Sequence, residues 1–147
     1  MNLNFIISEL PFSQPFLFVD KLLQIDENGV TGTYRFPEDS FFYKGHFKNN
    51  PVTPGVILTE CMAQIGLVCL GIFLISAEEN KKPQIGLSST EVEFYKPVFP
   101  GETVKVISTK IYFRFKKLKC KVEMFDSEEN LICRGTIAGM IKPDERI

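Results

Sequence analysis

The chain contains a single histidine, His46, which is the first candidate for chemistry in the sequence. It lies in Tyr43-Lys-Gly-His-Phe47, a segment of glycine and aromatic residues that precedes a long apolar stretch. Histidine is the side chain best suited to exchange a proton near neutral pH. A lone histidine is more often structural than catalytic. Its place in a loop that leads to a helix start nevertheless favours a general base.

The second candidate is Glu60, the lone acidic residue of the apolar stretch 55–76. A carboxylate is costly to bury unless it is paired, hydrogen-bonded or protonated. Burial would raise its pKa, so that the protonated acid could donate a proton. A partly exposed helix face near the N-terminus, where negative charge interacts favourably with the helix dipole, explains the residue equally well.

Gly55 is the third candidate, because it lies at the expected start of the same helix. Its missing Cβ lets another group approach the first N–H donors of the helix. Those donors and the positive end of the helix dipole suit a carbonyl oxygen that gains negative charge. Simple helix-start geometry is an equal alternative for this glycine.

The segment around these candidates predicts the helix that must position them. Thr53 is the expected N-cap and Pro54 the expected first helical residue. Apolar residues occupy nearly every position from 56 to about 76, so we expect a helix that is buried on most of its circumference. The uninterrupted apolar part, 65–75, is shorter than the roughly 20 residues of a membrane span. We therefore expect a core helix and no transmembrane segment.

Strand patterns lie on both sides of this helix. Residues 16–36 predict a hairpin, with its turn at Asp26-Glu-Asn-Gly29. After the helix, strands are expected at 90–96, 103–115, 118–125 and 131–141, the last two joined by a turn at 126–130. One helix and many antiparallel strands imply an α+β domain whose sheet curls around the helix. At 147 residues, the whole chain, 1–147, is expected to be one domain.

Composition narrows the class of function. The net charge is −1, which argues against a general nucleic-acid binder, since that affinity needs a strongly positive field. The N-terminus lacks the basic lead and long apolar run of a secretory signal. No Cys-x-x-Cys pair or second histidine is present, so no structural zinc site is expected. Free thiols in a reducing cytoplasm are expected instead for Cys61, Cys69, Cys120 and Cys133.

The segments that hold the three candidates resemble a known family signature. Gly45-His-Phe47, followed by Pro51-Val-Thr-Pro-Gly-Val-Ile-Leu-Thr-Glu-Cys-Met-Ala-Gln64, is similar to the motif of the FabA/FabZ 3-hydroxyacyl-[acyl-carrier-protein] dehydratases. Leu10 to Asp20 resembles that family's opening strand, and Phe94 to Glu102 resembles its later strand and turn. The resemblance spans about residues 10–141. Glutamate in place of aspartate in the helix favours the FabZ-type branch.

This resemblance implies a hotdog fold, in which a curled antiparallel sheet wraps around one long central helix. It implies a cytoplasmic hydro-lyase, without metal or cofactor, that converts (3R)-3-hydroxyacyl-[acyl-carrier-protein] to trans-2-enoyl-[acyl-carrier-protein] in fatty-acid or related polyene or lipid biosynthesis. His46 and Glu60 would be catalytic, with Glu60 either protonating the leaving hydroxyl or holding a water that does, and the N–H of Gly55 would bind the thioester carbonyl. The acyl chain would occupy an apolar tunnel along the helix, with Phe73 among its lining residues.

The resemblance also implies partners. The substrate arrives on an acyl carrier protein through a phosphopantetheine-linked acyl chain. The protein itself would form a homodimer or an assembly of dimers. Each site would take His46 from one protomer and Glu60 from the other.

Two departures from the family pattern are visible. The family follows Gly-His-Phe with Pro-Gly and a short polar residue, whereas this chain has Lys48-Asn-Asn50. The early Leu-Pro-His becomes Leu10-Pro-Phe12. The altered loop bears on where His46 lies and on substrate preference. A hotdog acyl thioesterase and a non-catalytic dehydratase-like partner subunit are the alternatives, and retention of both His46 and Glu60 favours the dehydratase.

A basic run, Lys110 to Lys121, holds six cations in twelve residues. Lys117, Lys119 and Lys121 would share one face of a strand. The simplest interpretation is a solvated outer face. A docking surface for an acidic carrier protein is the sharper alternative.

Overall fold

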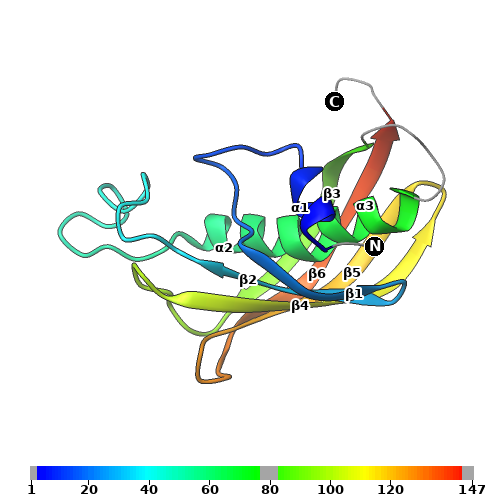
Figure 1. Ribbon diagram of the computed structural model, residues 1–147. Coiled ribbons are helices and arrows are strands. Elements are labelled where there is room, and N and C mark those ends of the chain that lie inside the picture. The colour runs from blue at the N-terminus through cyan, green and yellow to red at the C-terminus, as the bar shows by residue number, and fades with distance from the viewer. Residues whose placement is uncertain (1–2, 77–82, 144–147) are drawn as a thin grey trace.

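One antiparallel sheet curls around a long helix in the computed structural model, which describes residues 3–76 and 83–143 (Figure 1). The sheet has the strand order β1-β2-β4-β5-β6-β3. This arrangement confirms the predicted α+β hotdog architecture. The elements are α1 (Leu3–Ser8), β1 (Lys21–Asp26), β2 (Gly29–Arg35), α2 (Gly55–Ala63), η1 (Gln64–Val68), α3 (Cys69–Ser76), β3 (Pro83–Phe94), β4 (Thr103–Arg114), β5 (Lys117–Phe125) and β6 (Leu131–Pro143).

The central helix, formed by α2, η1 and α3, changes its hydrogen-bond pattern at its midpoint. η1 is one π-helical turn, and all five of its residues are buried. Such a turn frees backbone groups for outside partners, and Ser108 Oγ of β4 donates to the Gly66 carbonyl at 2.8 Å. A Cβ on Gly66 would lie 3.1 Å from side-chain atoms of Ser108 and Val122. The π turn is therefore seated directly against the sheet, shortly after Glu60.

This helix is the core of the molecule. The segment Gly55–Ile75 is long and apolar enough to cross a membrane by length and composition, but 72% of its most apolar window is buried inside the protein. The inward residues of β4, β5 and β6 cover it, and apart from Ser108 they are apolar and almost fully buried. The expectation of a core helix is confirmed.

Local turn chemistry also follows the sequence. Asp26 Oδ1 accepts hydrogen bonds from the backbone N–H groups of Asn28 and Gly29, at 2.7 and 3.1 Å, and closes the β1–β2 hairpin. Asp126 Oδ1 does the same for two N–H groups of the β5–β6 turn. Both predicted turns are confirmed. Carboxylates in such turns satisfy N–H groups that have no strand partner.

The helix start differs from the prediction. The helix begins at Gly55, with Pro54 as its N-cap and no side-chain cap bond. Thr53 is not the cap, because its backbone N–H bonds to Val98 O at 2.8 Å and its Oγ1 lies 2.6 Å from Tyr43 Oη. These contacts with distant segments outweigh the local capping preference.

Three further differences come from long-range packing. The predicted strand at 16–20 is irregular, and β1 begins at Lys21. β3 begins at Pro83 and not at residue 90, because it pairs with β6 along its whole length. The helix α1 was not predicted, and it forms with Ile6 fully buried in the core. A six-residue helix is not stable by itself, so packing holds it.

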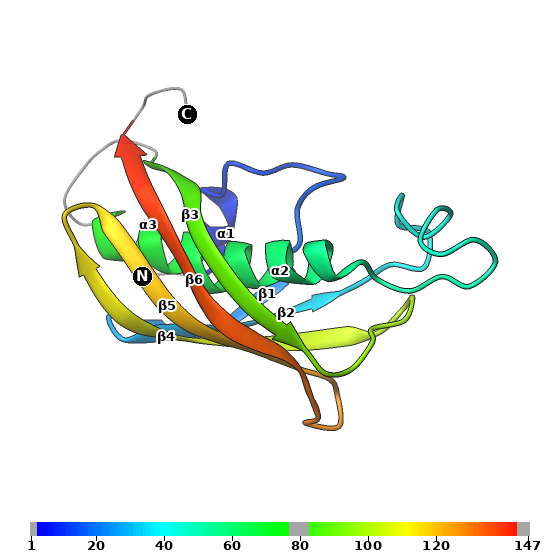
Figure 2. The same cartoon turned by 180° about the vertical axis from the view of Figure 1, so that it is seen from behind.

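The site candidates lie at one end of this architecture. The loop between β2 and α2 extends away from the sheet and helix at the end where α2 begins (Figure 1). β3 is an edge strand of the sheet, as the opposite view also shows (Figure 2). The single chain thus leaves three parts exposed: the start of α2, the loop before it and the outer edge of β3.

Candidate active site

The loop that carries His46 is ordered by its own hydrogen bonds. Val52 N donates to His46 O at 2.8 Å, and Phe47 and Asn50 exchange two backbone hydrogen bonds of 2.9 Å each. Asn49 has φ 62°, a left-handed conformation that asparagine tolerates better than most other non-glycine residues. The altered loop sequence therefore still closes a tight turn directly after the histidine.

One ring nitrogen of His46 is committed to this loop. Its Nδ1 lies 2.9 Å from Val52 O. A carbonyl oxygen can only accept, so Nδ1 carries the ring proton and Nε2 has a free lone pair. The half-buried ring stacks on Phe47, with the ring centroids 4.0 Å apart. The loop thus presents a fixed imidazole tautomer that can take up a proton at Nε2.

Glu60 lies in the second turn of α2 and is half-buried. Burial raises its pKa, and a hydrogen bond from Gln64 Nε2 to Glu60 Oε2, 2.9 Å long, partly opposes this shift. The first effect is the larger, so the pKa of the carboxyl group lies above its ordinary value. A carboxyl group of this kind keeps its proton at a higher pH than a solvated one and suits a general acid.

Gln64 is a functional candidate that the sequence reasoning missed. It is 0% exposed and is hydrogen-bonded to the backbone of a distant segment as well as to Glu60. Its Oε1 accepts from Phe18 N at 2.7 Å, and its Nε2 donates to Phe16 O at 3.0 Å. The sequence does contain an indication of this role, because a polar residue one helical turn after Glu60 lies on the same face of the helix.

Gly55 is the first residue of α2. The first N–H groups of any helix have no partner within it, and they point outward with the positive end of the dipole. A Cβ at this position would lie 3.2 Å from Phe94 Cζ and 3.3 Å from Phe94 Cε1. Glycine therefore allows an aromatic ring to lie closely against the beginning of the helix.

The single chain does not join the two candidate catalytic side chains. No hydrogen bond or ring contact links His46 with Glu60 in the residues that the structure describes. His46 contacts Val52 and Phe47 in its own loop, whereas Glu60 contacts Gln64 of the central helix. Each half of the proposed site is ordered by itself.

Large apolar side chains are exposed around this end of the molecule. Val56, in the first turn of α2, is 77% exposed. The others belong to the loop before α2, to the end of β3 and to the segment after it: Phe41, Phe47, Phe94, Tyr95 and Phe99. An exposed apolar surface of this kind, together with an unpaired strand edge, is typical of a protein–protein interface.

The cysteines offer no reactive or metal-binding group. All four are free and buried, and burial raises the pKa of the Cys120 thiol to about 11 and of the Cys133 thiol to about 12. These thiols are neutral and unreactive at physiological pH. Within residues 3–76 and 83–143, no cluster of three or more histidine, cysteine or acidic side chains is arranged to hold a metal ion.

Comparisons of the sequence identify its relatives. A family model described as a FabA-like domain matches residues 10–137. The 3-hydroxyacyl-[acyl-carrier-protein] dehydratase FabZ of Caldicellulosiruptor bescii is 32% identical over 143 residues, which cover 96% of this chain and 99% of that protein. The FabZ of Ehrlichia canis is 34% identical over 152 residues, with 98% and 97% of the two chains covered.

Solved structures support the fold. The dehydratase heterocomplex from Xenorhabdus doucetiae matches with a TM-score of 0.79 and 13% identity, over 95% of this chain and 91% of that chain. A hypothetical thioesterase with coenzyme A from Streptococcus pneumoniae matches with a TM-score of 0.62 and 10% identity, over 86% and 88% of the two chains. At these identities the likeness concerns the fold alone.

Proposed function

This chain belongs to the FabA-like family and is a FabZ-type 3-hydroxyacyl-[acyl-carrier-protein] dehydratase of fatty-acid biosynthesis, and on that premise we propose that His46, Glu60 and the N–H of Gly55 perform its reaction. The observation that carries the assignment is the His46 Nδ1–Val52 O hydrogen bond, because it leaves Nε2 as the base. The raised pKa of Glu60 supports its role as the acid.

The proposed reaction is the elimination of water from a (3R)-3-hydroxyacyl thioester. His46 Nε2 takes the proton from C2, and negative charge develops on the thioester oxygen. The Gly55 N–H, at the positive end of the helix dipole, stabilises that charge. Glu60 then protonates the leaving hydroxyl, the C3–O bond breaks, and water and the trans-2-enoyl thioester are released. The acyl chain would lie along the apolar helix, beside residues such as the half-buried Phe73.

A product assay tests this function directly. The purified protein is incubated with 3-hydroxybutyryl and trans-2-enoyl thioesters, and both the enoyl absorbance and free thiol are followed. We expect interconversion of the two acyl groups without release of thiol. Free thiol without interconversion would indicate a thioesterase, the alternative enzymatic function. Inactivity with both substrates would indicate a non-catalytic subunit.

We further propose a homodimer, or an assembly of such dimers, with the two sites at the interface. The exposed apolar surface around α2 and the unpaired edge of β3 support a second copy as the partner. The separate contacts of His46 and Glu60 within one chain support sites that are completed by the neighbouring protomer.

A cytoplasmic location is also proposed. All four cysteines are free thiols, which is typical of a reducing compartment. The one helix of membrane-spanning length is largely buried as the core of the sheet. Localisation of a tagged protein in cell fractions would test this assignment.

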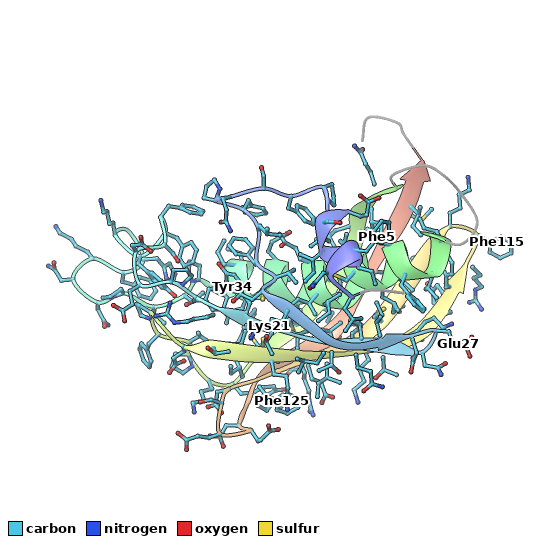
Figure 3. The ribbon with its side chains drawn as sticks, viewed as in Figure 1. Phe5, Lys21, Glu27, Tyr34, Phe115 and Phe125 are labelled. Atoms are coloured by element: carbon cyan, nitrogen blue, oxygen red, sulfur yellow. The ribbon has the colours of Figure 1, made fainter. Side chains whose placement is uncertain are left out.

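The carrier protein is proposed to dock on the β4–β5 hairpin. Phe115, at its tip, is 90% exposed and points away from the body of the molecule (Figure 3). Alternate residues of β5 are buried, which leaves Lys117, Lys119 and Lys121 on its outer side. No acidic residue occurs between Glu102 and Glu123. The hairpin therefore offers a cationic surface to a partner that carries negative charge.

Charge reversal should weaken this docking. The variant Lys116→Glu/Lys119→Glu is expected to raise KM for a carrier-bound substrate by roughly tenfold, because like charges then face each other. KM for a small thioester without carrier should stay unchanged. Steady-state kinetics with both substrates measures the difference. The control is Lys21→Glu, which reverses a single charge at the start of β1, away from the hairpin. An equal loss with both substrates, or no loss with either, would contradict this docking site.

A further inference from the structure

We propose that Gln64 is a positioning residue that fixes Glu60 with Oε2 as a hydrogen-bond acceptor and with Oε1 as the oxygen that holds and delivers the proton. The inference rests on the proposed role of Glu60 as the acid. The two oxygens of the Glu60 carboxyl group thus have different roles. The difference arises from the buried Gln64 amide, which does not itself contact the substrate.

The orientation of the Gln64 amide is determined by its partners. A backbone N–H can only donate, so the atom that faces Phe18 N at 2.7 Å must be the amide oxygen. The nitrogen therefore lies on the other side, where its two hydrogens donate to Phe16 O at 3.0 Å and to Glu60 Oε2 at 2.9 Å. If the amide were turned by 180°, its oxygen would face the oxygens of Phe16 O and Glu60 Oε2, and its N–H groups would face the Phe18 N–H.

The fixed amide in turn determines where Glu60 holds its proton. Oε2 faces an N–H donor, so a hydrogen on Oε2 would meet the hydrogen of Gln64. The proton of the neutral carboxyl group therefore lies on Oε1, the oxygen without this contact. Burial favours that neutral form. Without Gln64, the carboxyl group could rotate, and either oxygen could carry the proton.

The same hydrogen bond affects the strength of the acid. It stabilises the carboxylate that remains after the proton has been delivered, and so it lowers the pKa of Glu60 against the larger effect of burial. Loss of the Gln64 amide should leave burial unopposed. Glu60 would then hold its proton to a higher pH and release it less readily to the leaving hydroxyl.

The variant Gln64→Met tests the proposal, because it keeps an unbranched side chain of similar size without the amide. We expect kcat for dehydration to fall on the order of 10- to 100-fold, as for a misplaced catalytic group. KM should change little. The alkaline limb of the pH profile of kcat/KM, which reports the acid of the free enzyme, should move to higher pH.

Cys61→Ala is the matched control. Cys61 also holds the N-terminal segment, since its Sγ donates to Phe18 O at 3.4 Å, but it has no hydrogen bond with the carboxyl group of Glu60. Loosening that segment alone should leave the alkaline limb in place. If Cys61→Ala moves the limb as far as Gln64→Met does, the effect comes from the segment and the proposal is overturned.

A double-mutant cycle with Glu60→Gln separates the two possible failures. If Gln64 acts through Glu60, then Gln64→Met should add little loss in the Glu60→Gln background. If Gln64→Met lowers kcat by the same factor in the Glu60→Gln background as in the wild type, Gln64 has only a structural role and the inference is overturned. If Glu60→Gln alone leaves dehydration intact, Glu60 is not the acid, and the role of Gln64 fails with it.

Folding is checked by far-UV circular dichroism. If Gln64→Met does not fold, Gln64→Glu takes its place, because it keeps an acceptor for Phe18 N. Its added charge next to Glu60 should cause a loss that disappears in the Glu60→Gln background. A loss of equal size in both backgrounds would again overturn the proposal.

Discussion

Replacement of His46 by alanine is expected to lower kcat/KM for dehydration by roughly 10²- to 10⁴-fold, the usual contribution of a positioned general base. Within the residues that the structure describes, the ring makes one hydrogen bond, to Val52 O, and the backbone bonds of the loop do not depend on the imidazole. The variant should therefore stay folded. Hydration of the enoyl thioester should fall by the same factor, since both directions share one transition state.

The matched control for this prediction is His46→Asn. The side-chain amide of asparagine can donate to Val52 O as Nδ1 does, but it has no nitrogen that accepts a proton at neutral pH. Loss of activity in both variants would identify the ring as the base. Retention of activity in His46→Asn, with loss in His46→Ala, would mean that the histidine only holds the loop. Steady-state rates and circular dichroism provide both readouts.

A mixture of the inactive variants His46→Ala and Glu60→Gln should regain activity. In a heterodimer of His46→Ala and Glu60→Gln protomers, one site carries both defects and the other carries neither, if each site spans the interface. With statistical mixing, half of the dimers are heterodimers with one intact site each. The mixture is then expected to recover roughly one quarter of the wild-type activity.

A second heterodimer makes this test decisive. A protomer that carries both changes is paired with a wild-type protomer through different affinity tags. Sites that span the interface would each contain one defect, so this heterodimer should be inactive. Sites within one chain would leave the wild-type protomer active and would give no recovery in the first mixture. The two outcomes are opposite, and both are measured as enoyl thioester formed per dimer.

Features that depend on local pattern and residue type could be predicted from the sequence. The apolar run after Gly55 identified the core helix, and the acidic residues Asp26 and Asp126 marked turns that the structure confirms. Residue type was also enough to single out His46 and Glu60, because few side chains can exchange a proton near neutral pH. Their roles remain predictions until the variants are measured.

Features that rest on contacts between distant segments became apparent in the folded chain. Gln64 was one polar residue in an apolar helix until its bonds to Phe16 and Phe18, 48 and 46 residues away in the sequence, were seen. Thr53 has the residue type and position expected of a helix N-cap, but its hydroxyl group is hydrogen-bonded to Tyr43, ten residues earlier. The pattern of neighbouring residues in the sequence indicates whether a segment is helix or strand and which hydrogen bonds form within it. Which donors and acceptors meet across the core depends on how the sheet closes around the helix, and no local pattern contains that information.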